Sequence, residues 1–213
     1  MSASDQVWLN FLQRQRAIAV IRAPEQLLAY QMAKAVASGG MRLIEIAWNS
    51  QQAAALIQQL RSELPMCKIG AGTLLNQEQM QQAIAAGAQF LFTPHVDRTL
   101  IEMAIASSIP VIPGGLSPTE IVSAWRLGAT CIKVFPIQSV GGANYIQSLQ
   151  GPLGHIFLIP TGGVTLDNAK EFLAAGAIAV GLSGSLFPKQ AVAKGDWNSI
   201  ARRAETLLKR LQV

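Results

Sequence analysis

Eight short apolar runs recur along the chain, and each is followed by a segment whose apolar residues have helical spacing. Most of the runs are continuous rather than alternating, which is typical of strands in a parallel sheet that is covered on both faces. The regular alternation predicts an α/β fold, a single (β/α)8 TIM barrel over residues 1–213. The runs lie within AIAVIR, GGMRLIEI, CKIGAG, GAQFLFTP, IPVIPG, GATCIKVFP, FLIPTGG and GAIAVGLSG.

Local signals mark where the predicted helices end and begin. A glycine precedes four of the strands, where it suits the left-handed residue just past a helix C-terminus. The stretch 117–120 has the sequence of a capping box with proline at the first helical position, and Asn76 with Gln79 predicts another helix start. The four glycines are Gly40, Gly87, Gly128 and Gly176.

An extra helix is predicted before the first strand. Its apolar residues at helical spacing predict that it closes one end of the barrel, while a last helix from about Trp197 to Leu211 completes the outer ring. The apolar residues of the first helix are Val7, Trp8, Phe11 and Leu12.

The repeat also predicts depth within the barrel. Five residues after each of the four glycines lie Glu45, Phe92, Lys133 and Gly181, on alternate strands. Side chains alternate between the two faces of a strand, and the branched neighbours of Glu45 and Lys133 are expected to face the helices. Both ionisable groups are therefore predicted to point into the barrel, in one layer.

Lys133 lies between apolar neighbours in CIKVFP. Desolvation disfavours the ammonium form, lowers the pKa of a lysine and leaves an amine that attacks carbonyls, which is Schiff-base chemistry. Alternatively, Lys133 ends its strand and extends the ammonium into solvent. With Glu45 it forms either a structural ion pair or a catalytic pair, and a position near the C-terminal ends of the strands favours catalysis.

Two glycine-rich loops follow the seventh and eighth strands. Glycines let backbone N–H groups approach an anion closely, and these two loops are the usual phosphate site of such barrels. The alternative is that both are tight turns. Together they predict a site for a phosphate or another small anion at Thr161, Gly162 and Gly163 and at Ser183, Gly184 and Ser185.

Further polar residues end the strands around the same mouth. Arg22 follows the first strand and is expected near Glu45, where it either clamps an anion or tunes the carboxylate. Thr73 and Thr93 offer hydroxyls to a substrate, or they cap the next helices. His95 is expected to be a residue of the rim.

Composition limits the classes of function. The net charge is +5, but the basic residues are scattered, which argues against nucleic-acid binding and favours small anionic substrates. The two cysteines and two histidines form no metal-binding or disulfide pattern, so no metal site is predicted. Neither a signal peptide nor a membrane span is recognised, and a soluble cytoplasmic protein is expected.

The ordered motifs AVIR, GGMRLIEI, GAGTL, FTPH, PGGLSPTE, KVFP, PTGGV and GLSGSLFP resemble the 2-keto-3-deoxy-6-phosphogluconate and 4-hydroxy-2-oxoglutarate aldolase family. These are class I aldolases of the Entner–Doudoroff type, and the resemblance runs from about Arg16 to Pro188. It implies a Schiff base on Lys133, proton transfer by Glu45, no metal or other cofactor, and a homotrimer. It further implies substrate contacts from Thr73, Pro94 and Phe135, and phosphate contacts from Gly162, Gly163 and residues 183–185.

The sequence departs from the family pattern near the glutamate. The family has threonine, an apolar residue and arginine after it, and that arginine typically helps to hold the pyruvate carboxylate. Here the residues are Ala47, Trp48 and Asn49, so whether Arg22 or Asn49 takes over that role is left open. The order of Ser183 and Gly184 is also reversed, which leaves the serine that contacts phosphate unassigned.

These observations predict a class I aldolase that cleaves a phosphorylated 2-keto-4-hydroxy acid. The expected substrate is 2-keto-3-deoxy-6-phosphogluconate, cleaved to pyruvate and an aldehyde such as glyceraldehyde 3-phosphate. Two alternatives keep the same lysine: a 4-hydroxy-2-oxoglutarate aldolase and an oxaloacetate decarboxylase. A third is a non-catalytic barrel that binds a phosphate ligand, because a fold does not determine function.

Overall fold

The computed structural model describes residues 3–211, which contain eight strands, ten α-helices and one 3-10 helix. The strands are β1 (Ala17–Ile21), β2 (Leu43–Ala47), β3 (Lys68–Gly72), β4 (Leu91–Phe92), β5 (Val111–Ile112), β6 (Ile132–Val134), β7 (Leu158–Pro160) and β8 (Val180–Leu182). The helices are α1 (Ala3–Gln15), α2 (Gln26–Ser38), α3 (Ala53–Glu63), α4 (Gln77–Ala85), α5 (Arg98–Ala106), α6 (Pro118–Arg126), the 3-10 helix η1 (Ile137–Val140), α7 (Ala143–Leu153), α8 (Ala169–Ala174), α9 (Lys189–Ala193) and α10 (Trp197–Leu211).

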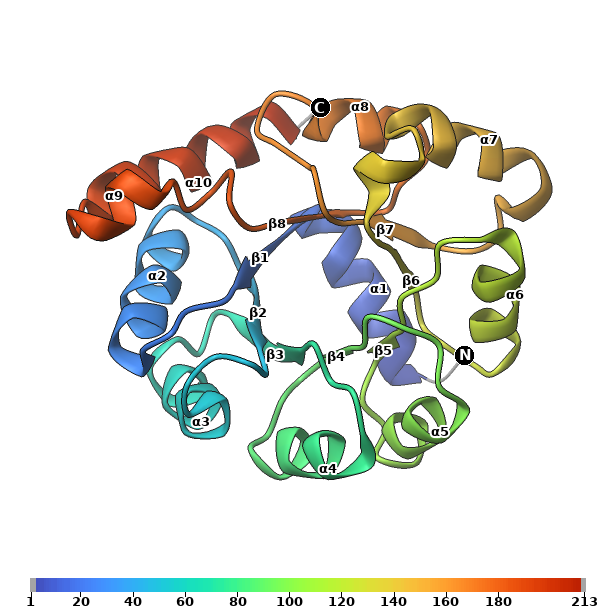
Figure 1. Cartoon of the computed structure of the whole chain (residues 1–213), viewed down its shortest axis with the longest axis horizontal. Helices are drawn as coiled ribbons and strands as arrows, with labels where there is room; N and C mark the ends of the chain where they lie inside the picture. Colours follow the sequence, from blue (N-terminus) through green and yellow to red (C-terminus); the bar gives the residue numbers. More distant parts are fainter. Residues whose placement is uncertain (1–2, 212–213) are drawn as a thin grey trace.

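All paired strands run parallel, which confirms the predicted α/β class. Six strands form a curled sheet in the order β5-β4-β3-β2-β1-β8, and β6 pairs with β7. Isolated bridges join the two sheets at both junctions, between Gly114 and Lys133 and between Thr161 and Gly181. The ladders are short there because Pro113 and Pro160 have no N–H to donate. Figure 1 shows the helices as a ring around the strands.

Apolar side chains on the two faces of the strands form two cores. Ile44, Ile46 and Ile132 face outward and belong to the core between strands and helices. Leu43 and Cys131 point inward and belong to a smaller core enclosed by the strands. The predicted alternation of faces along β2 and β6 is therefore confirmed, and Glu45 and Lys133 share the inward phase.

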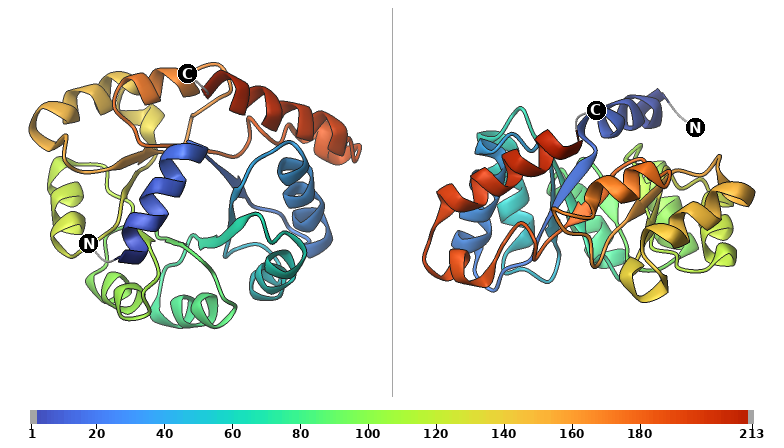
Figure 2. Two further views of the ribbon diagram at one scale, coloured as in Figure 1. Left: turned by 180° about the vertical axis from the view of Figure 1, so that it is seen from behind. Right: turned by 90° about the horizontal axis from the view of Figure 1, so that it is seen from above.

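Helix α1 lies across the N-terminal ends of the strands, as Figure 2 shows from behind and from above. Trp8, Leu9 and Leu12 are buried in the inner core, and the Trp8 ring lies 4.8 Å from that of Phe90, centroid to centroid. The helix therefore closes this end, as predicted. The assignment of Val7 to the closing face was wrong, since its side chain is 69% exposed.

The predicted helix boundaries are largely confirmed. All four repeat glycines have positive φ, between 81° and 96° for Gly40, Gly87 and Gly128 and 103° for Gly176. Residues Ser117 and Glu120 form the complete capping box of α6. Residues 166–168 form a turn that leads directly into α8, which begins at Ala169 with Asn168 as its N-cap residue.

None of the helices in the part of the chain that the structure describes combines the length and the apolar character that a membrane-spanning segment needs.

Candidate active site

Glu45 on β2 and Lys133 on β6 are both buried and share the inward phase of their strands. Their side chains are 1% and 6% exposed. The four ion pairs found within residues 3–211 do not include these two groups, so the alternative of a structural ion pair does not hold there. The burial of Lys133 also excludes the alternative in which its ammonium extends into solvent. A buried amine and a buried carboxyl therefore share one layer without direct contact.

Burial dominates the electrostatics of Glu45. It raises the pKa of this carboxyl, while the positive charges of Lys133 and Arg22 oppose the rise. Within the described residues, the Oε1 atom of Glu45 has no hydrogen-bond partner. A carboxyl whose pKa is raised and whose oxygen is unpaired is suited to accept a proton and to return it.

Aromatic rings surround the Lys133 amine. Its Nζ atom lies 5.5 Å from the Phe92 ring centroid and 5.1 Å from that of Phe135. Phe92 in turn meets Phe90 edge to face, with centroids 5.9 Å apart. The Lys133 amine therefore lies between two aromatic rings at the edge of the inner core.

Two glycines of β3 make room for these groups. A Cβ atom on Gly72 would lie 1.7 Å from Oε1 of Glu45, and one on Gly70 would lie 2.4 Å from the Phe90 ring. No real Cβ tolerates such distances, so the inward face of β3 must be bare. The sequence KIGAG signals this strand, and its glycines are functional positions that sequence reasoning missed.

A cavity of about 630 Å³ opens above Lys133, at the C-terminal ends of the strands. Every residue predicted for the site lines it except Glu45, which lies beneath it. The structure thus brings together side chains from six separate strand ends. They are Arg22, Thr73, Pro94, Lys133, Phe135, Thr161, Gly162, Gly163, Ser183, Gly184 and Ser185, with Val20, Val164, Thr165 and Gly181 beside them.

Arg22 reaches from the end of β1 to the segments that follow β2 and β3. Its Nε donates to Oδ1 of Asn49 at 3.1 Å, and its Nη2 donates to Oγ1 of Thr73 at 3.4 Å. Thr73 therefore contacts Arg22 rather than capping α4, which Asn76 caps through the N–H of Gln79. This arrangement puts a guanidinium at the mouth of the cavity, within electrostatic reach of Glu45.

Both glycine-rich loops line the cavity. The N–H of Leu166 donates to Oγ of Ser185 at 3.1 Å and so joins them. Arg203 of α10 fixes the second loop, since its Nε donates to the Ser185 carbonyl at 2.9 Å. Among the hydrogen bonds of the described residues, none is donated by the backbone N–H of Gly163 or Gly184. These donors are available to an anion.

The loop after β4 uses its hydroxyl internally. Oγ1 of Thr93 donates to the carbonyl of His95 at 2.6 Å, and Asp97 rather than Thr93 caps α5. Thr93 therefore shapes the turn that holds Pro94 against the cavity. Its hydroxyl serves neither of the two roles considered from the sequence.

Comparison with known proteins bears on this arrangement. The sequence model described as KDPG and KHG aldolase matches residues 9–203. The chain belongs to the KDPG and KHG aldolase family. It is 33% identical to a 2-dehydro-3-deoxy-phosphogluconate aldolase of Treponema pallidum, over 92% of this chain and 94% of the relative. It is also 33% identical to the KHG/KDPG aldolase of Escherichia coli K12, over 83% of each chain.

A solved structure is similar to this aldolase throughout. The KDPG aldolase of Legionella pneumophila, with pyruvate captured as a covalent carbinolamine intermediate, aligns with a TM-score of 0.86 at 27% identity. The alignment covers 97% of this chain and 98% of that one. The present chain is therefore an aldolase, a lyase, with the architecture of an enzyme that holds pyruvate covalently.

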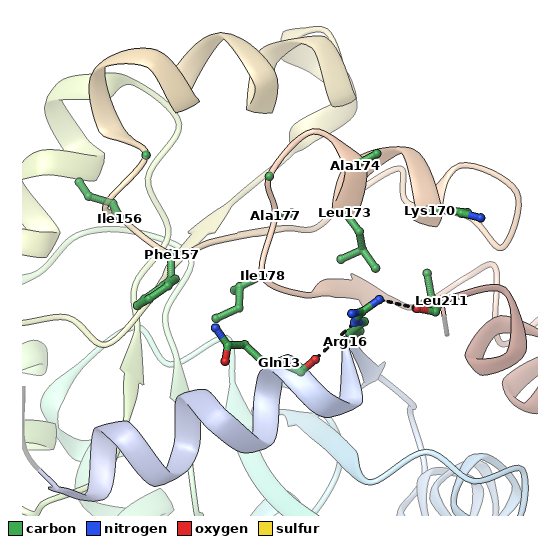
Figure 3. A pocket seen from close by; sticks show the side chains of 12 residues that line it. Gln13, Arg16, Ile156, Phe157, Lys170, Leu173, Ala174, Ala177, Ile178 and Leu211 are labelled. Atoms are coloured by element: carbon green, nitrogen blue, oxygen red, sulfur yellow. Dashed lines mark hydrogen bonds between the residues drawn. The ribbon is translucent and has the colours of Figure 1, made fainter. Parts of the chain in front are cut away.

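This aldolase has a second cavity, of about 490 Å³, at the opposite end of the strands beside α1 (Figure 3). None of the predicted site residues lines it. Its arginine, Arg16, donates to the carbonyls of Leu211 at 2.8 Å and Gln13 at 3.4 Å, and so ties α10 to α1. That charge serves the fold.

Proposed function

We propose that this aldolase reversibly cleaves a 2-keto-4-hydroxy acid to pyruvate and an aldehyde, with Lys133 as the nucleophile. The single observation that carries the proposal is the buried amine of Lys133 in one layer with the unpaired carboxyl of Glu45, beneath the cavity. The amine adds to the C2 ketone, and loss of water from the carbinolamine gives an iminium ion.

Glu45 moves the protons. It takes the proton of the C4 hydroxyl, directly or through a water, while the C3–C4 electron pair passes into the iminium to give an enamine and a free aldehyde. The protonated Glu45 then returns the proton to C3 of the enamine. Hydrolysis of the resulting iminium consumes the water released earlier, frees pyruvate and restores the Lys133 amine.

Arg22 is the proposed partner of the substrate carboxylate. It is the guanidinium that lines the cavity, and its bonds to Asn49 and Thr73 leave further N–H donors for an anion. Together with the bound carboxylate, the rings of Pro94 and Phe135 confine the three-carbon end of the substrate near Lys133. Thr161 lines the same region.

The loops at residues 162–163 and 183–185 are the proposed phosphate site. Free N–H donors of Gly163 and Gly184 support this assignment, as does the open space beside Gly184. The proposed substrate is therefore phosphorylated, 2-keto-3-deoxy-6-phosphogluconate, which yields glyceraldehyde 3-phosphate. The name of the Escherichia coli relative also favours 4-hydroxy-2-oxoglutarate as a second substrate.

Three broader features belong to the same proposal. The two bridges between the sheets support one closed (β/α)8 barrel domain across the chain. The family resemblance supports a homotrimer, which light scattering coupled to gel filtration would test. Cys67 and Cys131 are free and buried, and burial raises the pKa of both thiols, which suits a reducing cytoplasm.

Borohydride reduction in the presence of pyruvate tests the nucleophile. The expected result is one stable adduct, which peptide mass mapping finds on Lys133. The variant Lys133→Ala should form no adduct and lose cleavage activity, whereas Lys170→Ala, at an exposed position of α8, should keep both. An adduct on another lysine would refute the proposal. Cleavage rates with phosphorylated and unphosphorylated keto acids and with oxaloacetate then rank the substrates.

A further inference from the structure

Arg22 needs support to act as a carboxylate clamp. Its side chain is long and exposed, and the four ion pairs within residues 3–211 do not include it. An unrestrained arginine loses considerable side-chain entropy when it binds a ligand. What limits that freedom here is the pair of hydrogen bonds to Asn49 and Thr73.

We infer that Asn49 is a positioning residue, which holds the guanidinium of Arg22 across the mouth of the cavity in the orientation that receives the substrate carboxylate. The inference rests on the proposed function, because it concerns the same reaction. Asn49 is exposed and does not line the cavity, whereas Arg22 and Thr73 do. Asn49 therefore acts through Arg22 and not on the substrate.

The geometry explains how one amide sets the orientation. A guanidinium is planar, so fixing its Nε edge fixes the direction of its other donors. Oδ1 of Asn49 occupies the Nε edge at 3.1 Å. Within the described residues no hydrogen bond is donated by Nη1 of Arg22, and the end-on pair of Nη1 and Nη2 is the edge that binds a carboxylate with two parallel bonds.

A second hydrogen bond reinforces the same contact between loops. The N–H of Ala23 donates to Oγ of Ser50 at 3.2 Å, one residue further along both segments. Ser50 is buried, and its N–H donates to the carbonyl of Ala47 at 2.9 Å. The segment after β1 and the segment after β2 are thus joined at two successive residues, which gives Asn49 a fixed position from which to hold Arg22.

The amide is also the appropriate chemical group. An aspartate at position 49 would neutralise the charge of Arg22, and an arginine would repel it. Asn49 accepts the bond without either effect. At the position where the family pattern has an arginine, this chain has a neutral amide that supports the guanidinium of Arg22.

The test measures how tightly keto compounds form the trapped adduct. Apparent dissociation constants for pyruvate and for uncharged methyl pyruvate are obtained from borohydride trapping at increasing concentration. Leucine is similar in size to asparagine but has no acceptor, so Asn49→Leu should raise the apparent dissociation constant for pyruvate about tenfold. This is the range expected for the loss of one hydrogen bond to a charged group. Methyl pyruvate should be unaffected, and so should both ligands in the control Asn198→Leu on α10.

Two results would overturn the inference. One is equal weakening of pyruvate and methyl pyruvate, which indicates general damage to the site. The other is an additive effect in the double variant Arg22→Gln/Asn49→Leu, since a residue that acts through Arg22 adds nothing once Arg22 is gone. Asn49→Ala provides a second variant should Asn49→Leu not fold. Failure of the parent protein to trap pyruvate is a different outcome, because it contradicts the proposed function itself.

Discussion

At the scale of single residues, Glu45 carries an electrostatic cost because its carboxyl is removed from water. Its carboxyl is buried, and its Oε1 atom has no hydrogen-bond partner among the described residues. The nearby positive charges only partly offset the cost of desolvation. Proteins accept such a cost mainly at functional sites. The cost itself is measurable, because it depends on pH.

Replacing Glu45 with glutamine should change how stability depends on pH. Burial raises the pKa of Glu45 in the folded state, so above its unfolded pKa of about 4.3 the folded protein binds more protons than the unfolded chain. The free energy of unfolding therefore falls as the pH rises from there to the folded pKa. In Glu45→Gln that fall should disappear, and the variant should melt at a higher temperature than the parent at pH 7.

Thermal melts from pH 4 to pH 8 provide the measurement, in steps of about half a unit around the reference pKa. Glu102→Gln, at an exposed position of α5, is the matched control and should follow the parent curve. Parallel curves for the parent and Glu45→Gln would show that Glu45 is not the group with the raised pKa.

Some residue positions could be predicted from the sequence and others could not. The inward orientation of Glu45 and Lys133 could be predicted because side chains alternate between the two faces of a strand and because both residues lie five positions after a repeat glycine. The contact of Arg22 with Asn49 does not, because it depends on the path of two loops after different strands. The periodic spacing of apolar residues carries no information about the path of a loop.

At the scale of secondary-structure elements, β3 is an unusual strand because its inward face bears no side chain beyond Lys68 at its start. Gly70 and Gly72 leave the space that Phe90 and Glu45 fill. Strand β3 thus contributes to the site through the absence of side chains at Gly70 and Gly72. The strand itself was predictable from KIGAG, but the neighbours that occupy its empty face were not.

Replacing Gly72 with alanine should displace Glu45 and spare Lys133. The new Cβ would lie 1.7 Å from Oε1, so the carboxylate must move and its alignment with C4 of the substrate is lost. We expect the cleavage rate to fall roughly a hundredfold, which is typical for loss of a general base, while the pyruvate adduct still forms. Steady-state kinetics and borohydride trapping separate the two effects.

Gly151→Ala is the control for this change. In α7 a Cβ at that position meets no atom within 4 Å, and alanine should stabilise the helix by about 0.5–1 kcal/mol relative to glycine without affecting the rate. Unchanged cleavage by Gly72→Ala would contradict the proposed role of Glu45.

Helix starts show the limits of local signals. The box at Ser117 and Glu120 starts α6 where predicted. Thr165 and Asn168 exchange the same kind of hydrogen bonds, and they do so in a turn that directly precedes α8. Reciprocal side-chain bonds stabilise a turn whether or not a helix follows at once.

At the scale of the whole molecule, the sequence order predicted the parallel strands and the closing helix, but not the interruptions of the sheet. The interruptions occur where the strands β4 to β8 are only two or three residues long and where prolines lack a backbone N–H donor. The length of a hydrogen-bonded ladder depends on both of its strands, so one strand's sequence does not predict it. The aromatic stack from Trp8 through Phe90 to Phe92 likewise depends on three separate elements.

The aromatic stack and α1 close the N-terminal end of the strands, whereas the cavity that Lys133 lines lies at their C-terminal ends. In the proposed mechanism pyruvate stays covalently attached to Lys133 when the aldehyde forms, so the aldehyde leaves first and pyruvate leaves last. Pyruvate should consequently inhibit cleavage competitively against the keto acid, and the aldehyde should inhibit in a mixed pattern. Competitive inhibition by the aldehyde would mean random release. In the direction of synthesis, the same covalent attachment requires pyruvate to bind before the aldehyde.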